Sequence, residues 1–398
     1  MMFGGAAGVR DEVGFLIVHQ RYADHFFPGT SVLHTRLRYA LLIPWLYQSL
    51  RTKRPVPKDF GQAFSDLEHE LTGRLKYVEG VGGEKDGVIG GEVFPRTISQ
   101  PPAYVYWTAL TKWGLIGARP DGRPWSRPDM AKLLAASSKR AHHDDDGKPL
   151  ETVAWPISGL IDAPRDWDSW GDWNDRYSQD DQGKLALDLL PPEQIYLATK
   201  LRAVRSPTDP SEPSLLSKLV GKPLGGADHC WDNEILALAG REAAMLKRAG
   251  QAAALSAIGR AIYAAQVETL KETRDKRPQP NLHRAELNDA IEQWGKQAAR
   301  LDMDLFLAEI GHLPPAVEGV LKETSAWVRA NGKDPMQLLE VYARAEVSRK
   351  DNRARLASNQ FGVDRRMEWQ GEHHGRAEPL HYRWGNVKRL LRDLEDVA

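Results

Sequence analysis

Arginine side chains alternate with tyrosine and tryptophan in the C-terminal part of this sequence. Arginine binds phosphate groups through a planar fork of donors, and aromatic rings stack on nucleic-acid bases. The pattern predicts a nucleic-acid-binding site. Its residues are Arg353, Arg355, Arg365, Arg366, Tyr382, Arg383 and Trp384. The alternative is that Tyr382 and Trp384 lie in the core and the arginines are ordinary salt-bridge partners.

A second basic-aromatic patch lies near the N-terminus, where Arg36 and Arg38 precede Tyr39. On a helix Arg36 and Tyr39 would share a face, whereas Arg38 would point elsewhere. We expect both arginines to join the nucleic-acid contacts. The alternative is an arginine that caps or braces a neighbouring helix.

No recognised catalytic motif occurs in the sequence. The phosphate-binding glycine loop, the zinc-protease helix and the serine-hydrolase elbow are all missing. His142, His143 and Asp144 to Asp146 are suitable metal ligands, but beside Gly147 they also fit a solvated loop. Cys230 beside His229 fits a small buried side chain better than a nucleophile. We therefore predict no catalytic residue, no metal site and no cofactor, and a protein that is more consistent with a non-enzyme.

The composition is that of a globular protein with unevenly distributed charge. The 398 residues contain 54 basic and 54 acidic side chains, so an overall basic nucleic-acid-binding surface is excluded. Residues 139–190 carry a net charge of −6, from 12 acidic and 6 basic residues. Residues 349–392 carry +6, from 11 basic and 5 acidic residues. We expect the acidic middle to dock a basic partner surface.

Cysteine usage and hydropathy predict a cytoplasmic protein. The single cysteine excludes a disulfide framework and is typical of a reducing compartment. The first ten residues do not resemble a signal peptide. The longest apolar stretch, residues 39–47, is far shorter than the roughly 20 residues of a membrane helix. We therefore expect no membrane partner.

The periodicity of apolar residues predicts a mainly α, multi-helical fold in three regions, 1–91, 92–190 and 191–398. In the first region, Thr30 or Ser31 can cap a helix that Pro44 kinks, and residues 60–77 form an amphipathic helix. In the second, helices at 103–113 and 126–136 have the outline of a helix-turn-helix or winged helix. Its second helix offers Arg127 and Lys132, with Lys139 and Arg140 just beyond.

The third region is predicted to be helical almost throughout. A proline-free segment predicts one very long helix over residues 233–271, with a stripe of small side chains that allows a neighbouring helix to approach closely. The stripe consists of Gly250, Ala253, Ala257, Ala261 and Ala264. Further helices are expected at 284–310, 315–330, 335–347 and 386–394.

Two groups of residues resemble the signatures of a bacterial family that is catalogued only as a domain of unknown function. Residues 27–31, 35–39 and 43–45 resemble its opening signature. Residues 353–359, Trp369, Gly371 and 382–384 are similar to its closing signature. Residues 11–14 and 104–114 also fit this family. The long helix departs from the family pattern, because it is richer in alanine and glycine.

The resemblance implies a biological setting but no activity. Genes of this family lie beside helicases and phospholipase-D-like nucleases in anti-phage defence islands. We therefore expect a non-catalytic subunit or adaptor of an anti-phage defence complex that contacts DNA and a helicase or nuclease partner. Two alternatives stay open: a metal-dependent nuclease that uses carboxylates and His142 or His143, and a helix-turn-helix DNA-binding regulator.

Overall fold

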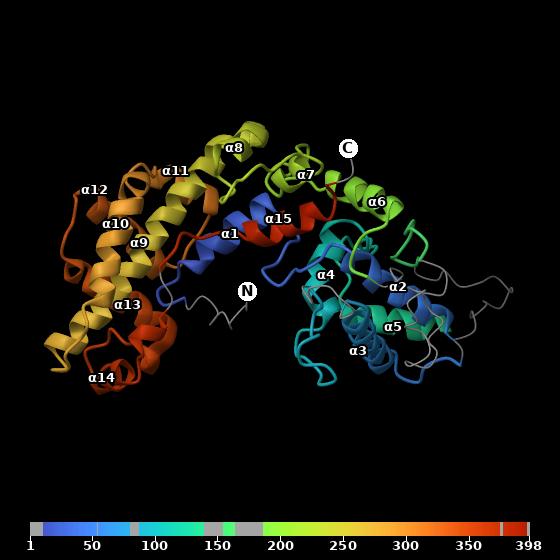
Figure 1. Ribbon diagram of the computed structural model, residues 1–398, viewed down its shortest axis with the longest axis horizontal. Coiled ribbons are helices and arrows are strands. Elements are labelled where there is room, and N and C mark those ends of the chain that lie inside the picture. The colour runs from blue at the N-terminus through green and yellow to red at the C-terminus, as the bar shows by residue number, and fades with distance from the viewer. Residues whose placement is uncertain are drawn as a thin grey trace. The chain divides into compact units, whose positions relative to one another are not determined.

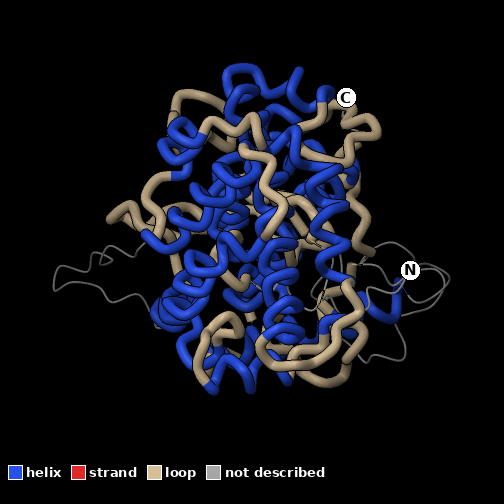
Figure 2. The backbone as a smooth tube through the Cα atoms, turned by 90° about the vertical axis from the view of Figure 1, so that its left-hand side faces the viewer, coloured by secondary structure: helices blue, strands red, loops and turns tan. Residues whose placement is uncertain are grey.

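The computed structural model describes residues 11–53, 55–79, 87–138, 154–163, 186–374 and 377–395. Helices joined by turns and loops make up this part of the chain, and none of its residues lies in a β-strand (Figures 1 and 2). The mainly helical class predicted from the sequence is therefore confirmed. None of the helices in the described ranges is long and apolar enough to cross a bilayer.

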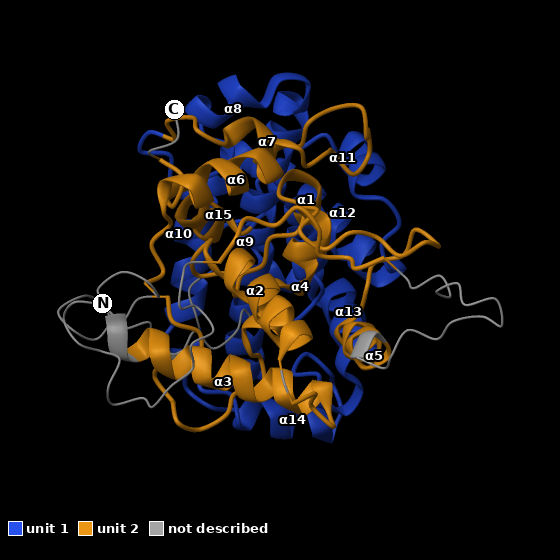
Figure 3. Cartoon of the chain, turned by 90° about the vertical axis from the view of Figure 1, so that its right-hand side faces the viewer, with its two compact units in different colours: residues 1–23, 225–382 blue, residues 24–224, 383–398 orange. Residues whose placement is uncertain are grey.

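The chain divides into two compact units that interleave along the sequence (Figure 3). Unit 1 contains residues 1–23 and 225–382, and unit 2 contains residues 24–224 and 383–398. These boundaries differ from the three consecutive regions, 1–91, 92–190 and 191–398, that were predicted from the sequence. The first helix, α1 (Leu16–Phe26), begins in unit 1 and ends in unit 2.

Unit 2 is built around α2 (Tyr39–Thr52), whose side chains from Tyr39 to Tyr47 are all buried. Such a helix has no solvent-facing side and must be covered by its neighbours. It packs against α3, α4 and α5. Pro44 lies inside α2, which continues through it. The predicted cap at Thr30 or Ser31 is wrong, because residues 31–38 form turns and loop and the helix begins only at Tyr39.

The second helix of this unit, α3 (Phe60–Glu79), confirms the amphipathic helix predicted at 60–77. It begins after Asp59, whose Oδ1 accepts hydrogen bonds from the amides of Gly61 at 2.8 Å and Gln62 at 3.0 Å. A side-chain acceptor at this position satisfies amides that lack a partner inside the helix. The predicted apolar face is buried. It consists of Phe64, Leu67, Leu71 and Leu75.

The next two helices, α4 (Pro102–Lys112) and α5 (Arg127–Ser138), lie where the sequence predicts them. Prolines at 101 and 102 favour the start of α4, since their fixed φ suits the first helical turn. Gly114 follows its end with a φ of +68°, which glycine adopts without strain. The remaining helices of unit 2 are α6 (Pro191–Arg202), α7 (Leu215–Leu219) and α15 (Trp384–Arg392).

The central helix of unit 1 is shorter than predicted. The sequence predicts one helix over 233–271, but the structure has α8 (Asn233–Ala239) and α9 (Ala243–Thr273). Gly240 separates them with φ +61° and ψ −125°, a backbone conformation outside the helical region. A proline-free segment was therefore not sufficient evidence for a continuous helix.

Helix α9 is buried on nearly all sides between Ala249 and Glu268. Helix α10 (Leu282–Ala298) packs along it. That the stripe of small residues forms this contact stays a prediction. Two glycines of α9 accommodate aromatic rings as well. A Cβ at Gly250 would lie 2.6 Å from Trp231, and a Cβ at Gly259 would lie 2.2 Å from Phe15.

The predicted helix over 284–310 is also divided, because Asp302 begins a new one. Its Oδ1 accepts a hydrogen bond from the amide of Leu305 at 3.0 Å, which caps α11 (Met303–Ile310). Unit 1 continues with α12 (Pro315–Arg329), α13 (Leu339–Lys350) and α14 (Gln360–Met367), in agreement with the helices predicted at 315–330 and 335–347.

Candidate nucleic-acid interface

The opening signature forms a turn around the hydroxyl of Tyr106 in unit 2. This oxygen accepts hydrogen bonds from the amides of Thr35 at 3.0 Å and Arg36 at 3.1 Å, and donates to the carbonyl of Arg36 at 2.7 Å. The ring of His34 stacks on Tyr106 with 4.1 Å between the ring centroids. Burial lowers the pKa of His34 to about 4, so its imidazole is neutral at physiological pH.

The two arginines of this turn are held by carboxylates. Nε of Arg36 lies 3.0 Å from Oδ1 of Asp393, and its Nη2 lies 2.5 Å from Oδ1 of Asp188. Arg38 is completely buried and pairs with Glu193 at 2.8 Å. Its guanidinium therefore cannot reach a ligand outside the protein in this conformation.

The closing signature contributes Arg383 and Trp384 to the same unit. Nη1 of Arg383 lies 2.6 Å from Oδ1 of Asp24 and donates to the carbonyl of Thr30 at 2.8 Å. Trp384 is buried, with its ring centroid 6.0 Å from that of Phe27. The two signatures thus meet in the core of unit 2, although more than 350 residues separate Arg383 from Thr30.

The other predicted contact residues from the C-terminal part of the chain lie in unit 1. Nη1 of Arg355 lies 3.1 Å from Oε1 of Glu12. Arg366 is buried and forms a double ion pair with Asp275, at 2.7 and 2.8 Å. The hydroxyl of Tyr382 donates to a backbone carbonyl of α9 at 2.8 Å. These interactions are internal links within unit 1.

The structure therefore corrects the prediction of one exposed surface formed by the two ends of the chain. Arg38, Arg366, Tyr382 and Trp384 are buried, and carboxylates hold Arg36, Arg355 and Arg383. Of the predicted contacts, Arg353 is exposed and Arg365, paired with Glu368, has a side chain that is 41% exposed. Nucleic-acid binding by these two stays a prediction. The predicted residues also fall into different units.

The structure does not support the two alternative sites, a metal site at residues 142–146 and a nucleophile at Cys230. His142, His143 and Asp144 to Asp146 lie outside the described residues. Within the described ranges, no three His, Cys, Asp or Glu side chains are grouped so that they could hold a metal ion. Cys230 is fully buried, and burial raises the pKa of its thiol far above the usual range, which disfavours the reactive thiolate.

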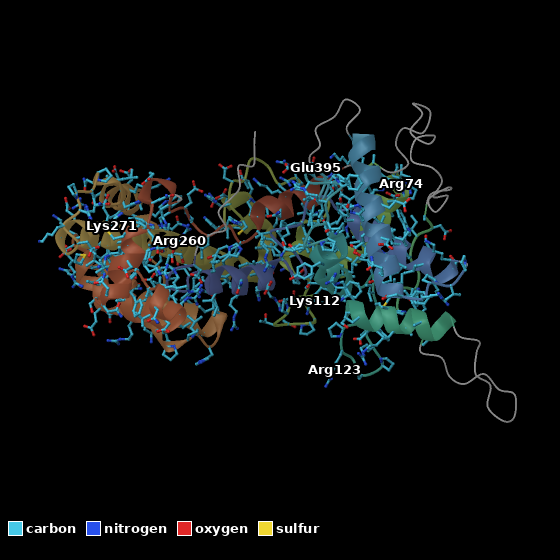
Figure 4. The ribbon with its side chains drawn as sticks, turned by 90° about the horizontal axis from the view of Figure 1, so that it is seen from below. Arg74, Lys112, Arg123, Arg260, Lys271 and Glu395 are labelled. Atoms are coloured by element: carbon cyan, nitrogen blue, oxygen red, sulfur yellow. The ribbon has the colours of Figure 1, made fainter. Side chains whose placement is uncertain are left out.

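A different group of cations is exposed on unit 2. Residues 96–138 contain six basic and two acidic side chains, a net charge of +4. Lys112, Arg123 and Lys132 are exposed, and within the part of the chain that the structure describes they form no salt bridge. Arg123 projects outward from its loop (Figure 4). We define the α4–α5 surface as Tyr104, Lys112, Arg119, Arg123, Arg127 and Lys132.

Two arginines of the α4–α5 surface lie over aromatic rings. The guanidinium of Arg127 lies 5.1 Å from the ring centroid of Tyr104, and that of Arg119 lies 5.3 Å from the ring centroid of Trp125. Nε1 of Trp107 donates to the carbonyl of Trp125 at 2.7 Å, which ties the loop to α4. The loop that carries Arg119 and Arg123 is thus attached to the helix that carries Tyr104 and Lys112.

The two acids of this region are already engaged. Asp129 pairs with Arg119 at 3.0 Å and accepts from the hydroxyl of Ser126 at 2.7 Å. Asp121 lies 3.7 Å from Arg119 and accepts from the amide of Arg123. The remaining cations therefore determine the local field.

A buried carboxyl group lies beneath this surface. Glu68 on α3 is 4% exposed and accepts a hydrogen bond from the amide of Ala103 at 2.7 Å. Burial raises the pKa of Glu68 to about 7, against the opposing effects of this amide and of Arg127. Its charge therefore changes near neutral pH, next to the first turn of α4.

Sequence reasoning found only part of the α4–α5 surface. Arg127 and Lys132 were predicted as part of a helix-turn-helix, but Lys112 and Arg123 were not selected. Residues 113–126 connect α4 to α5, which is longer than the three or four residues of a helix-turn-helix turn. The winged-helix interpretation stays a prediction. The signal that was missed is the excess of basic over acidic side chains within residues 96–138.

Residues 3–124 match a family of unknown function, DUF6361. The matched segment contains the opening signature and all of α4, and it ends before α5. The closing signature lies outside it. No curated protein and no solved structure matches the chain significantly. The similarity to DUF6361 therefore supplies no catalytic or binding residue.

Proposed function

We propose that the protein is a non-catalytic subunit of a larger assembly and that it contacts nucleic acid through the α4–α5 surface. The observation that carries this proposal is that Lys112, Arg123 and Lys132 are exposed and form no salt bridge with any residue that the structure describes, beside two arginine–aromatic pairs. Phosphate groups bind to lysine and arginine that are accessible and free of carboxylates. Carboxylates hold the signature arginines Arg36, Arg38, Arg355 and Arg383, whereas Arg353 is exposed.

The assembly is an anti-phage defence complex in this proposal, and the partner is a helicase or a phospholipase-D-like nuclease. The support for this part is the resemblance of the two signatures, together with the match of residues 3–124 to a family of unknown function. Purification of the tagged protein with its gene neighbours tests it. Co-purification of a helicase or nuclease subunit is the expected result, and purification of the chain alone would count against it.

The nucleic-acid contact is tested by fluorescence anisotropy with labelled oligonucleotides at several salt concentrations. The wild-type affinity is expected to fall steeply with salt, because cations that bind phosphate release condensed counterions. The triple variant Lys112→Ala, Arg123→Ala, Lys132→Ala removes one arginine and two lysines. It is expected to flatten the slope of log affinity against log salt by about 2.

A matched control exists in the same unit. Lys58→Ala, Arg205→Ala, Lys222→Ala also removes one arginine and two lysines, and all three residues are exposed. This control is expected to keep most of the wild-type affinity and slope. Equal losses in both triple variants would show that only net charge matters, and the proposed surface would be rejected.

A further inference from the structure

Tyr104 differs from the other tyrosines near α4 because its side chain is open to solvent. The residue is 49% exposed, whereas Tyr106 and Tyr47 are 0% and 2% exposed. It lies in the first turn of α4, where it contributes little to the core of unit 2. An exposed aromatic ring among cations is a feature of surfaces that bind unpaired bases.

Arg127 lies over this ring, with 5.1 Å between its guanidinium carbon and the ring centroid. This contact restricts both side chains before any ligand binds, which lowers the entropic cost of binding. Tyr104 is still 49% exposed with Arg127 in this position. A planar base can stack on the ring or on the guanidinium, while a phosphate pairs with the charge.

The same face of α4 continues toward a second cation. Tyr104, Thr108 and Lys112 are spaced by four residues, so they lie one above another on the helix. Thr108 and Lys112 are both exposed. Lys112 lies about 12 Å from Tyr104 along the helix axis. A strand with a base on Tyr104 can therefore place its backbone near Lys112.

We infer that the ligand of the α4–α5 surface is a single-stranded nucleic acid, one of whose bases stacks on Tyr104. This inference rests on the proposed function, because it names the ligand class of the same surface. In a duplex each base is stacked between the neighbouring bases, so its faces are not available to a tyrosine ring on a protein helix. In a single strand the faces are available to aromatic side chains.

The test compares three labelled probes of equal length with the full-length protein: oligothymidylate, a strand of abasic sugar-phosphate units, and a mixed-sequence duplex. Wild type is expected to bind oligothymidylate about tenfold or more tightly than the abasic strand, since the two probes share phosphates and differ in bases. Tyr104→Ala is expected to abolish this preference. Tyr104→Phe is expected to keep it, because the phenyl ring still stacks.

Lys112→Ala serves as the matched control on the same helix face. It is expected to weaken binding of oligothymidylate and of the abasic strand by the same factor, because it removes a phosphate contact only. Circular dichroism and the unfolding midpoint establish that each variant is folded. Tyr104→Leu adds a variant with an apolar side chain that lacks the aromatic ring, and it is expected to behave like Tyr104→Ala.

The two proposals fail in different ways. Equal affinity for oligothymidylate and the abasic strand, an unchanged preference in Tyr104→Ala, or tighter binding of the duplex would overturn the single-strand inference. If the triple cation variant still lost affinity in those cases, the proposed function would survive. Absence of binding to all three probes would overturn both.

Discussion

Arg38 and Glu193 form an ion pair that is closed off from solvent inside unit 2. Nη2 of Arg38 lies 2.8 Å from Oε1 of Glu193, and the two side chains are 0% and 4% exposed. Arg38 also donates to the carbonyl of Ala186 at 2.5 Å. The most basic part of the opening signature therefore links the start of α2 to α6.

Replacement of Arg38 by alanine is expected to reduce the free energy of unfolding by about 3–5 kcal/mol, since the buried carboxylate of Glu193 would lose its counter-ion and keep only the amide of Leu190 as a partner. Urea titration followed by circular dichroism measures this. Lys58→Ala, at an exposed position of the same unit, is the control and is expected to change stability by less than about 0.5 kcal/mol. Similar stabilities for the two variants would mean that the pair is not formed.

The pair between Arg366 and Asp275 predicts that lysine cannot replace arginine at position 366. Arg366 makes two bonds to Asp275 and donates from Nη1 to the carbonyls of Arg355 at 2.6 Å and Ala357 at 3.0 Å. The planar guanidinium of arginine reaches the carboxylate and both carbonyls at once, and the compact ammonium group of lysine cannot. Arg366→Lys is expected to lower stability by about 2–4 kcal/mol and to accelerate amide exchange in α14. Wild-type exchange in α14 would contradict this.

Two helical glycines of unit 1 are expected to respond in opposite directions to alanine. At Gly259 a Cβ would lie 2.2 Å from Phe15, so Gly259→Ala is expected to cost about 1–3 kcal/mol. At Gly295 on α10 the nearest atom would lie at an ordinary 3.6 Å. Gly295→Ala is expected to stabilise by about 0.5–1 kcal/mol, because alanine favours helix. Thermal unfolding of both variants measures these changes. A Gly259→Ala variant as stable as wild type would contradict the close packing of Phe15 on α9.

The raised pKa of Glu68 predicts a pH dependence of stability. Its pKa rises from 4.5 to about 7 on folding, so the folded state binds the proton more tightly than the unfolded chain. The contribution of Glu68 is therefore fully present below about pH 4.5 and is lost as pH rises through about 7. Relative to wild type, Glu68→Gln is expected to gain up to about 3 kcal/mol between pH 4.5 and 8. Parallel stability curves for the two proteins would contradict the shifted pKa.

The sequence was sufficient to predict most helices, because their apolar periodicity and caps are local properties. The buried face of α3 and the proline start of α4 are examples. The breaks at Gly240 and Asp302 were missed. Each depends on one residue whose backbone or cap geometry overrides good helix formers on both sides.

The candidate site was harder to predict because charge partners are distant in the chain. Arg38 pairs with a carboxylate 155 positions away, and Arg36 with one 357 positions away. An arginine inside an ion pair and an arginine on an open surface look alike in sequence. The exposed cations of the α4–α5 surface were correspondingly underestimated, because Asp121 and Asp129 lie between them.

The central claim is that nucleic acid contacts residues of α4 and α5 and that the paired signature arginines, Arg36, Arg38, Arg355 and Arg383, are internal links. Photo-crosslinking of the full-length protein to a thiothymidine oligonucleotide, with peptide mapping by mass spectrometry, tests it most directly. Crosslinks are expected within residues 104–132, with Tyr104 among them, and their loss is expected in the triple cation variant. Crosslinks concentrated at 353–366 or 382–384 would contradict the account.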